Sequence, residues 1–353
     1  MPPDDHDASG APPVGADRTA VVTGAAGWLG QNLVRALAAS GRRVRALVQS
    51  ADEAPLVELA GSTVEVIVGD VRDPVAVDRL VEGTSGATVF HGAAVIHPRR
   101  AVRDLFDVNV GGTQHVLDRA RRSGAARFVH ISSNSPFGAN PSVEHRFDED
   151  SPANPYLGYG ASKLEAEGLV RRAQERGDVE TVIVRAPWFY GPFQPERQSR
   201  FFSAVRRGRF PLVGDGRQRR SLVYTGHLVQ GLLLAESVPG TAGRAYWVAD
   251  AEPYELRAVI GAVRDALTAE GLPVRARAPR VPVAAAALAA RLDALAQARG
   301  RYVQPLHVLG ELKDTIACDV TRARVELGYA PTTSLVDGMR ASVRWALDRG
   351  IAL

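Results

Sequence analysis

The sequence is poor in cysteine and in long apolar runs. Its 353 residues include one cysteine, Cys318, so no disulfide can form within the chain and a reducing compartment is indicated. We expect this thiol to be a small buried apolar group rather than a nucleophile. The longest apolar run, VPVAAAALAA at 281–290, is much shorter than the roughly 20 residues that a membrane-spanning helix needs. These absences favour a cytoplasmic protein with no membrane partner.

Lysine is also scarce. Of 43 basic residues only Lys163 and Lys313 are lysines, and the others are arginines spread along the chain. The net charge of +4 therefore does not gather into the basic stripe with interleaved aromatics that binds nucleic acid, and we expect no such partner. Residues 1–18 are rich in proline, glycine and aspartate without an apolar core, which predicts a disordered tail rather than a signal peptide.

Short β-branched runs alternate with helical segments in the first half of the chain. Strands are expected at 19–23, 43–48, 64–68, 88–91, 127–132 and 180–185, with helices between them, for example at 28–40 and 73–83. Near-continuous apolar strands separated by helices predict a parallel sheet covered on both faces. The sequence thus predicts a doubly wound α/β, Rossmann-type domain.

Residues beyond the predicted domain of 19–187 are also expected to contribute to the sheet. A helix at 225–237 is followed by an apolar run at 244–250, and we expect residues 225–250 to return to the sheet. Residues 188–224 and 251–353 are richer in helical patterns. They predict a smaller, mostly helical substrate-binding domain.

The first predicted strand runs directly into TGAAGWLG, which places Gly24, Gly27 and Gly30 at three-residue intervals before a helix. Glycines at such a turn allow a tight bend, close approach of backbone amides to a diphosphate, and close packing of helix on strand. The helix N-terminus adds unpaired N–H groups and partial positive charge. No Lys-Ser/Thr pair follows, so a dinucleotide site is favoured over a nucleotide-hydrolysing loop.

The second predicted strand ends in Val48, Gln49 and Ser50, without the acidic residue that usually binds the adenosine ribose of NAD. Arg42 and Arg43 are near in sequence, and nothing there would repel a 2′-phosphate. The cofactor is therefore NADP or NAD, with NADP favoured. Two readings of Asp70, at the end of the third strand, stay open: an acceptor for the adenine amino group, or a turn residue before a helix.

The rare lysine has a partner four residues earlier, because Tyr159 and Lys163 share one face of a predicted helix. A phenol with a pKa near 10 is a poor base, but a nearby ammonium and a positive nicotinamide ring would lower that pKa. Lysine suits this task as a compact point charge that arginine's planar fork does not match. Ser132 and Ser133 end the fifth strand, where they could hold a substrate oxygen or form a turn.

Together these motifs resemble the extended short-chain dehydrogenase/reductase family. TGAAGWLG, GDVRD, VFHGAAV, VNVGGT, RFVHISSNSPFG, YGASK and VRAPWFYGP occur in the family's order, over nearly all of residues 19–348. The resemblance implies that Ser133, Tyr159 and Lys163 are catalytic. It also implies a cofactor site formed by Gly24, Gly27, Trp28, Leu29, Gly30, Gln49, Asp70, Val71, Ala93, Ala94, Asn109, Tyr159, Lys163 and Pro187. No metal is implied, and a homodimer through 101–122 and the helix of Tyr159 is expected.

The family contains several reactions, and three remain open. Trp188, Phe189, Phe193, Phe201 and Phe202 are expected to crowd the substrate mouth. With Ser133 and Tyr159 on the substrate oxygen, they favour an NAD(P)-dependent oxidoreductase acting on a carbonyl or secondary alcohol of a cyclic, fairly apolar molecule, similar to 3β-hydroxysteroid dehydrogenases. The first alternative is a nucleotide-sugar epimerase in which Arg220 binds the diphosphate. The second is a non-catalytic dinucleotide-binding sensor.

Overall fold

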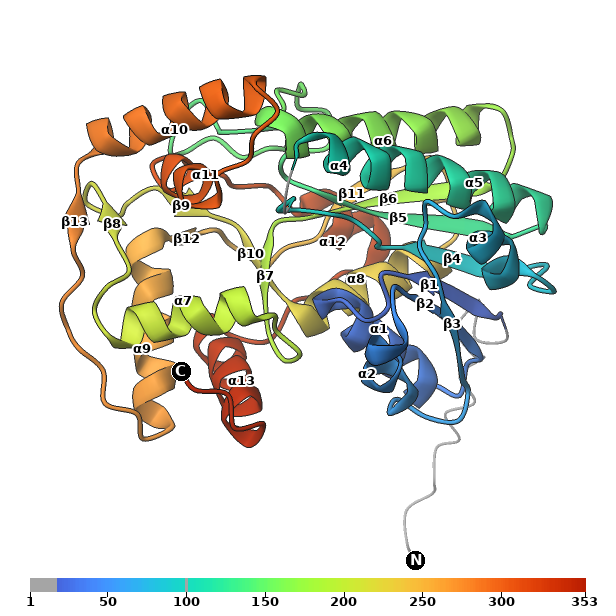
Figure 1. Ribbon diagram of the computed structural model, residues 1–353, viewed down its shortest axis with the longest axis horizontal. Helices are drawn as coiled ribbons and strands as arrows, with labels where there is room; N and C mark the ends of the chain where they lie inside the picture. The colour runs from blue at the N-terminus through green and yellow to red at the C-terminus, as the bar shows by residue number, and fades with distance from the viewer. Residues whose placement is uncertain (1–17, 99–100) are drawn as a thin grey trace, which may run out of the picture.

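The computed structural model describes residues 18–98 and 101–353 of the chain. The tail predicted at 1–18 lies outside these residues except for its last member. Figure 1 shows a sheet flanked by helices on one side of the molecule and a largely helical body on the other.

The sheet has seven parallel strands in the order β3-β2-β1-β4-β5-β6-β11. They are β1 (Ala20–Thr23), β2 (Val44–Val48), β3 (Val64–Val68), β4 (Thr88–His91), β5 (Arg127–Ser133), β6 (Glu180–Ala186) and β11 (Ala245–Trp247). The predicted doubly wound parallel sheet is therefore confirmed. The strand order reverses between β1 and β4, and ligands of such sheets bind at the carboxyl ends of the strands near that reversal.

Thirteen α-helices occur in the described residues. They are α1 (Trp28–Ala39), α2 (Pro55–Glu58), α3 (Pro74–Val81), α4 (Arg103–Phe106), α5 (Thr113–Arg122), α6 (Leu157–Glu175), α7 (Glu196–Arg206), α8 (Thr225–Ser237), α9 (Leu256–Ala269), α10 (Val283–Ala298), α11 (Gln304–Glu311), α12 (Thr321–Leu327) and α13 (Leu335–Asp348). A 3₁₀ turn spans Ala51–Glu53, and a π-helical turn, Asp107–Gly112, joins α4 to α5.

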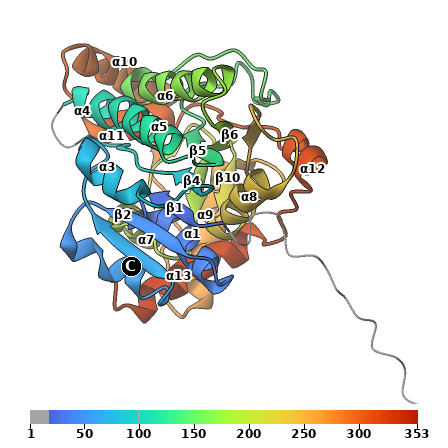
Figure 2. The ribbon, with the colours of Figure 1, turned by 90° about the vertical axis from the view of Figure 1, so that its right-hand side faces the viewer.

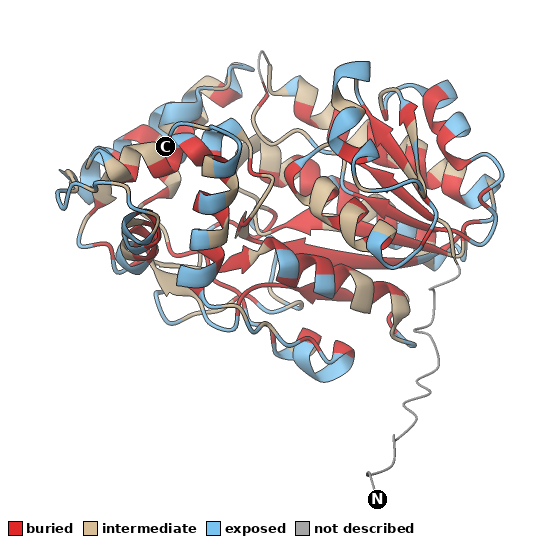
Figure 3. Cartoon of the chain, turned by 90° about the horizontal axis from the view of Figure 1, so that it is seen from below, coloured by how far each residue is buried: buried red, intermediate tan, exposed pale blue. Residues whose placement is uncertain are grey.

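Two apolar layers hold the sheet between helices. One layer packs α1 and α8 against one face, and the other packs α3, α5 and α6 against the opposite face. Because both faces are covered, the strands other than the edge strand β3 are almost wholly buried, as Figure 3 shows. Figure 2 shows α5 and α6 on the side of the sheet away from α1.

The chain beyond β6 makes a second apolar core from α7, α9 and α13. Six short strands outside the main sheet pair as β7 with β10, β9 with β12 and β8 with β13. They are β7 (Trp188–Tyr190), β8 (Leu212–Val213), β9 (Arg219–Arg220), β10 (Leu222–Tyr224), β12 (Tyr254–Glu255) and β13 (Arg280–Val281). Between these strands, α8 and β11 return to the sheet, where β11 lies beside β6. Cys318 is buried, and burial raises the pKa of its thiol to about 12.

Candidate active site

The turn between β1 and α1 tolerates little besides glycine. Gly24 has φ +69°, and a Cβ there would lie 2.8 Å from the backbone of Gly92 and Ala93 on the neighbouring strand end. A Cβ on Gly30 would lie 2.1 Å from the carbonyl oxygen of Gly24. Gly27, at the N-cap of α1, has no side chain to cover the helix end. Backbone amides at the start of α1 thus form a cradle that fits an anionic group such as a diphosphate.

The neighbouring strand ends do not supply the arginines expected for a 2′-phosphate. Arg42 is buried in an ion pair with Glu236, with Nη1–Oε2 at 2.7 Å, and Arg43 lies at the opposite end of β2 from the site. At the carboxyl end of β2, the backbone N–H of Gln49 donates to Glu53 Oε2 at 2.8 Å. The structure thus removes the arginine argument for NADP and places a carboxylate at this strand end.

Asp70, at the end of β3, is held by Arg72. The guanidinium donates to both carboxylate oxygens at 3.0 and 2.8 Å, and these hydrogen bonds keep the pKa of Asp70 below its usual value. The next residue, Val71, is buried and packs against Gly112 of the π-helical turn. Both Asp70 and Val71 therefore lie at the strand edge where the adenine end of a dinucleotide is expected.

Asn109 connects the loop after β4 to α6. Its side chain accepts from Val95 N at 2.8 Å and donates to Val95 O at 2.9 Å and Ser162 Oγ at 3.0 Å. It lies in the π-helical turn, a distortion that often marks functional positions. Ala93 and Ala94 lie in this loop after β4, which Asn109 holds in place. The backbone N–H of Ala93 also donates to Thr23 Oγ1 at 3.2 Å.

Lys163 is buried under the carboxyl end of β5. Its ammonium donates to Ile131 O at 2.8 Å and lies 3.4 Å from His130 Nε2. Burial lowers the pKa of Lys163 to about 8, although the carboxylate of Glu167, one turn further along α6, acts to raise it. The two groups therefore share the buried face of the helix that carries Tyr159.

Tyr159 and Ser133 lie together at this edge of the sheet. Burial raises the pKa of the Tyr159 phenol, while the Ser133 hydroxyl and the Arg197 guanidinium act to lower it. The Ser133 hydroxyl is also 3.3 Å from Ser135 Oγ and accepts from Ser135 N at 3.2 Å. The Ser133 hydroxyl and the Arg197 guanidinium thus oppose the effect of burial on this phenol. That Lys163 and a bound nicotinamide also lower the phenol pKa stays a prediction.

Arg197 and His97 are site residues that the motifs did not reveal in these positions. Arg197, in the first turn of α7, interacts electrostatically with both Tyr159 and His97. His97 forms a hydrogen bond with the hydroxyl of Tyr302, and burial lowers its pKa to about 4. No local pattern distinguishes Arg197 among the arginines, because its role comes from the fold bringing α7 to α6.

The predicted aromatic mouth is only partly correct. Phe201 and Phe202 are buried in the core of the helical body, which excludes them from a mouth. Phe193 lies between cationic groups, with the Arg35 guanidinium 4.1 Å from its ring centre. Trp188 and Phe189 lie on β7, directly after Pro187, and both remain half-buried. The ring centre of Phe189 is 4.9 Å from that of Trp28 in α1. Leu29 lies beside Trp28 in the first turn of α1.

Arg220 is occupied by the protein itself. Its guanidinium donates to the backbone carbonyl of Glu311, and the carboxylates of Glu311 and Asp314 act on it electrostatically. Those acidic residues line a small cavity with Asn134, Ser135 and Tyr156. A diphosphate brought to Arg220 would meet these carboxylates, which does not fit the diphosphate clamp expected from the sequence.

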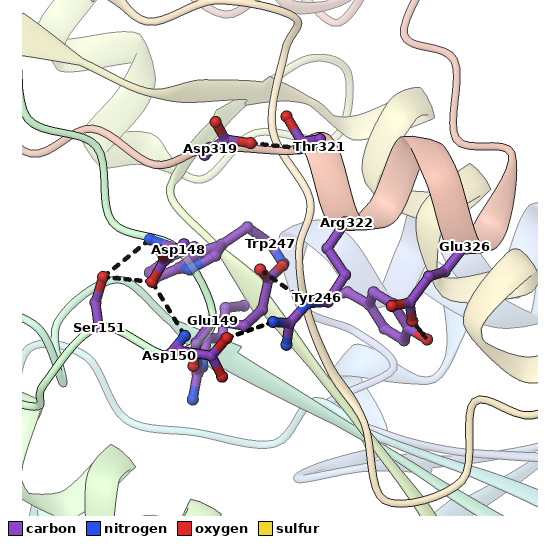
Figure 4. A network of polar contacts seen from close by, with 11 residues as sticks. Asp148, Glu149, Asp150, Ser151, Tyr246, Trp247, Asp319, Thr321, Arg322 and Glu326 are labelled. Atoms are coloured by element: carbon purple, nitrogen blue, oxygen red, sulfur yellow. Dashed lines mark hydrogen bonds and ion pairs between the residues drawn. The ribbon is translucent and has the colours of Figure 1, made fainter.

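The segment leading into α6 is held by residues from distant parts of the chain (Figure 4). Glu149 accepts from the backbone N–H of Trp247 at 2.9 Å, and Arg322 lies 2.6 Å from Asp150. Asp148 forms a turn with Ser151, in which the two side chains are 2.8 Å apart. Strand β11 and helix α12 therefore fix the loop immediately before the helix of Tyr159.

Comparison with known proteins identifies the family. The model of the NAD dependent epimerase/dehydratase family matches residues 20–249. The chain belongs to this family. The resemblance to extended short-chain dehydrogenases/reductases is thereby confirmed, and the chain is an NAD-dependent enzyme of the oxidoreductase, epimerase and dehydratase class.

Three relatives illustrate the range of this epimerase/dehydratase family. The uncharacterized protein y4nL of Sinorhizobium fredii is 43% identical, with 94% of this chain and 95% of the relative covered. The 4-hydroxy-2-methyl-3-oxo-4-farnesyl-3,4-dihydroquinoline-1-oxide ketoreductase of Stigmatella aurantiaca is 32% identical over 91% of this chain and 94% of its own. The 3 beta-hydroxysteroid dehydrogenase/Delta 5-->4-isomerase of Mycobacterium tuberculosis is 34% identical. The match covers 67% of this chain and 66% of the relative.

A solved family member has the same architecture. The dTDP-glucose 4,6-dehydratase DesIV of Streptomyces venezuelae, with NAD and TYD bound, matches with a TM-score of 0.73 and 26% identity, covering 94% of this chain and 98% of DesIV. Within residues 18–98 and 101–353, no helix is long and apolar enough to cross a membrane. The same residues contain no group of three or more side chains suited to hold a metal ion.

Proposed function

We propose that the protein is a dehydrogenase or ketoreductase that acts on a carbonyl or secondary alcohol of a cyclic, fairly apolar molecule. The observation that carries this choice within the family is Arg220, which binds the Glu311 carbonyl and is flanked by two carboxylates. The half-buried ring of Phe189, which packs on Trp28 beside the glycine turn, favours an apolar ligand in the same region. A ketoreductase of a farnesylated ring ketone and a hydroxysteroid dehydrogenase are among the relatives.

NAD fits the site better than NADP. Glu53 reaches the end of β2, where its carboxylate suits ribose hydroxyls and would repel a 2′-phosphate. When bound on the glycine turn, NADH supplies the hydride that reduces a ketone. Asp70, Asn109 and Lys163 would hold the adenine end, the loop after β4 and the nicotinamide ribose, respectively.

Tyr159 would transfer the proton and Ser133 would orient the substrate oxygen. In the reductive direction the phenol O–H donates to the carbonyl oxygen, and a raised phenol pKa keeps that proton in place at neutral pH. The Ser133 hydroxyl donates a second hydrogen bond to the same oxygen, which favours the negative charge that develops there. The Lys163 ammonium and the Arg197 guanidinium stabilise the phenolate that is left.

A panel assay tests the proposal. We expect NADH to be oxidised with bicyclic or steroidal ketones, with weaker activity for NADPH, and no turnover of UDP- or dTDP-hexoses. Thermal-shift measurements with the same compounds provide a readout independent of turnover. Protection by nucleotide sugars together with a tightly retained NAD, seen by native mass spectrometry, would instead assign epimerase chemistry. Binding of NAD without turnover of any compound would favour the sensor.

A further inference from the structure

Helix α10 exposes its large apolar residues and buries polar ones, the reverse of a helix that packs on a core. Its buried positions are Ala286, Ala289, Asp293 and Gln297, whereas its three leucines, Leu288, Leu292 and Leu295, are 56%, 45% and 53% exposed. A helix that packs on a core normally presents the opposite arrangement. The buried polar groups satisfy one another, because Asp293 binds His307 Nδ1 at 2.8 Å and accepts from Gln297 Nε2 at 3.1 Å. The orientation of α10 is therefore fixed by polar contacts, and its leucines are left outward.

The three leucines form one stripe. Their spacing of four and three residues places them on the same side of the helix. Figures 1 and 2 both show α10 at the periphery of the molecule, beside α11 and near the start of α6. The stripe thus belongs to an outer surface of the described chain.

The segment of the chain that carries this stripe is strongly basic. Between Glu270 and Glu311 the sequence has one acidic residue, Asp293, and it is fully buried. The exposed charges of this segment are arginines: Arg275, Arg277, Arg280, Arg291, Arg299 and Arg301. Exposed leucines beside arginines, without exposed acids, are the pattern of a helix that lies in the plane of an anionic membrane surface.

We propose that α10 docks on anionic lipid bilayers, with its leucine stripe in the boundary of the acyl chains and Arg291, Arg299 and Arg301 on the lipid phosphates. This departs from the sequence expectation of no membrane partner, which considered only spanning segments. A second copy of the chain fits the stripe less well, because two apposed α10 segments would bring their arginines together and this segment has no exposed acid to pair them. The inference does not depend on the reaction proposed above.

Docking through α10 would also place the active site near the lipid. The buried side of α10 reaches the first turn of α6, where Gly158 N donates to Gln297 Oε1 at 3.2 Å. Tyr159 is the next residue of that helix. An apolar substrate dissolved in the bilayer would thus reach the site without crossing much water.

Vesicle flotation with the full-length protein tests this surface. We expect the protein to float with vesicles of phosphatidylcholine and phosphatidylglycerol, not with phosphatidylcholine alone, and to be partly released by added salt. The triple variant L288S/L292S/L295S should lower the partition coefficient by about a hundredfold. A matched control replaces three exposed apolar residues elsewhere, L59S/V75S/V325S, and should bind as the parent does.

A second variant guards against unfolding as an explanation. L292W keeps the stripe apolar, and its fluorescence should shift to shorter wavelength when phosphatidylglycerol vesicles are added. Absence of flotation on anionic vesicles, or equal flotation of the leucine triple variant, would overturn the proposal. A dimer in solution that becomes a monomer in that variant, without lipid binding by the parent, would assign the stripe to a second copy and also overturn it.

Discussion

At the scale of single residues, the decisive group is the hydroxyl of Tyr159. In the variant Tyr159→Phe we expect kcat for ketone reduction to fall by about a thousandfold, because the proton donor is lost while the ring stays in place. The dissociation constant of NADH, measured by fluorescence titration, should change little. The matched control is Tyr246→Phe, which loses a hydrogen bond to Glu326 near α12 and should keep its activity. Equal turnover by both variants would contradict the assigned role.

The charge on Lys163 predicts a pH limit for the reaction. Burial lowers its pKa to about 8, so the ammonium is present below that pH and is lost as the pH rises through it. We expect kcat/KM for reduction to decline above about pH 8 in a profile measured with NADH at fixed concentration. A guanidinium does not deprotonate in this range, so Lys163→Arg should be slower but should lack this decline. A decline that persists in that variant would have another cause.

Site residues that belong to local sequence motifs could be predicted from the sequence. Contacts between residues far apart in the chain could not. The sequence places Tyr159, Lys163, Asn109 and the glycine turn correctly at one sheet edge, because each follows a recognisable strand or helix. The engagement of Arg220 with Glu311 depends on α11, nearly a hundred positions further along the chain. Likewise, the burial of Phe202 is decided by the packing of α7 on α9, which no local pattern encodes.

At the scale of elements, the glycine turn is the least tolerant connection. A Gly30→Ala methyl would press on the Gly24 carbonyl, so we expect a loss of about 3 kcal/mol in the free energy of unfolding and loss of NADH binding. Gly41, at the other end of α1, has φ +79° but open space around a Cβ. Gly41→Ala should lower stability by about 1 kcal/mol and leave NADH binding intact. Chemical denaturation and NADH titration measure both effects, and equal NADH affinity in the two variants would refute the cradle.

The first six strands of the sheet were predicted to within about one residue. The short strands of the helical body and the orientation of α10 were not predicted. Strands of a covered parallel sheet are continuous apolar runs, which are visible in sequence. In α10, alanines fill both sides of the helix, so the apolar residues do not reveal which side is buried. The orientation of α10 is set by His307 and Gln297, which bind Asp293 on the buried side, so that the leucines face outward.

At the scale of the whole molecule, two buried histidines predict acid sensitivity. Burial lowers the pKa of His91 to about 3 and the pKa of His130 well below its usual value. The unfolded chain therefore binds more protons below about pH 6.5, and stability falls as the pH drops toward the folded-state values. Between pH 7 and 5 we expect a loss of about 2 kcal/mol per histidine, measured by urea unfolding. The variant His130→Phe should show roughly half the pH dependence, and an unchanged slope would rule out this origin.

The contacts that fix the loop before α6 (Figure 4) have a consequence for the nascent enzyme. Phe147 pairs with the main chain of Ala317 and Asp319, and Asp150 with Arg322, so the loop before Tyr159 is completed by residues that leave the ribosome late. All seven strands of the sheet are made before residue 250. A chain ended at residue 310 would contain every strand of the sheet but lack the partners of this loop, so we expect it to fail to turn over substrate. Competence for chemistry is thus deferred until residues well beyond the last strand of the sheet have been made.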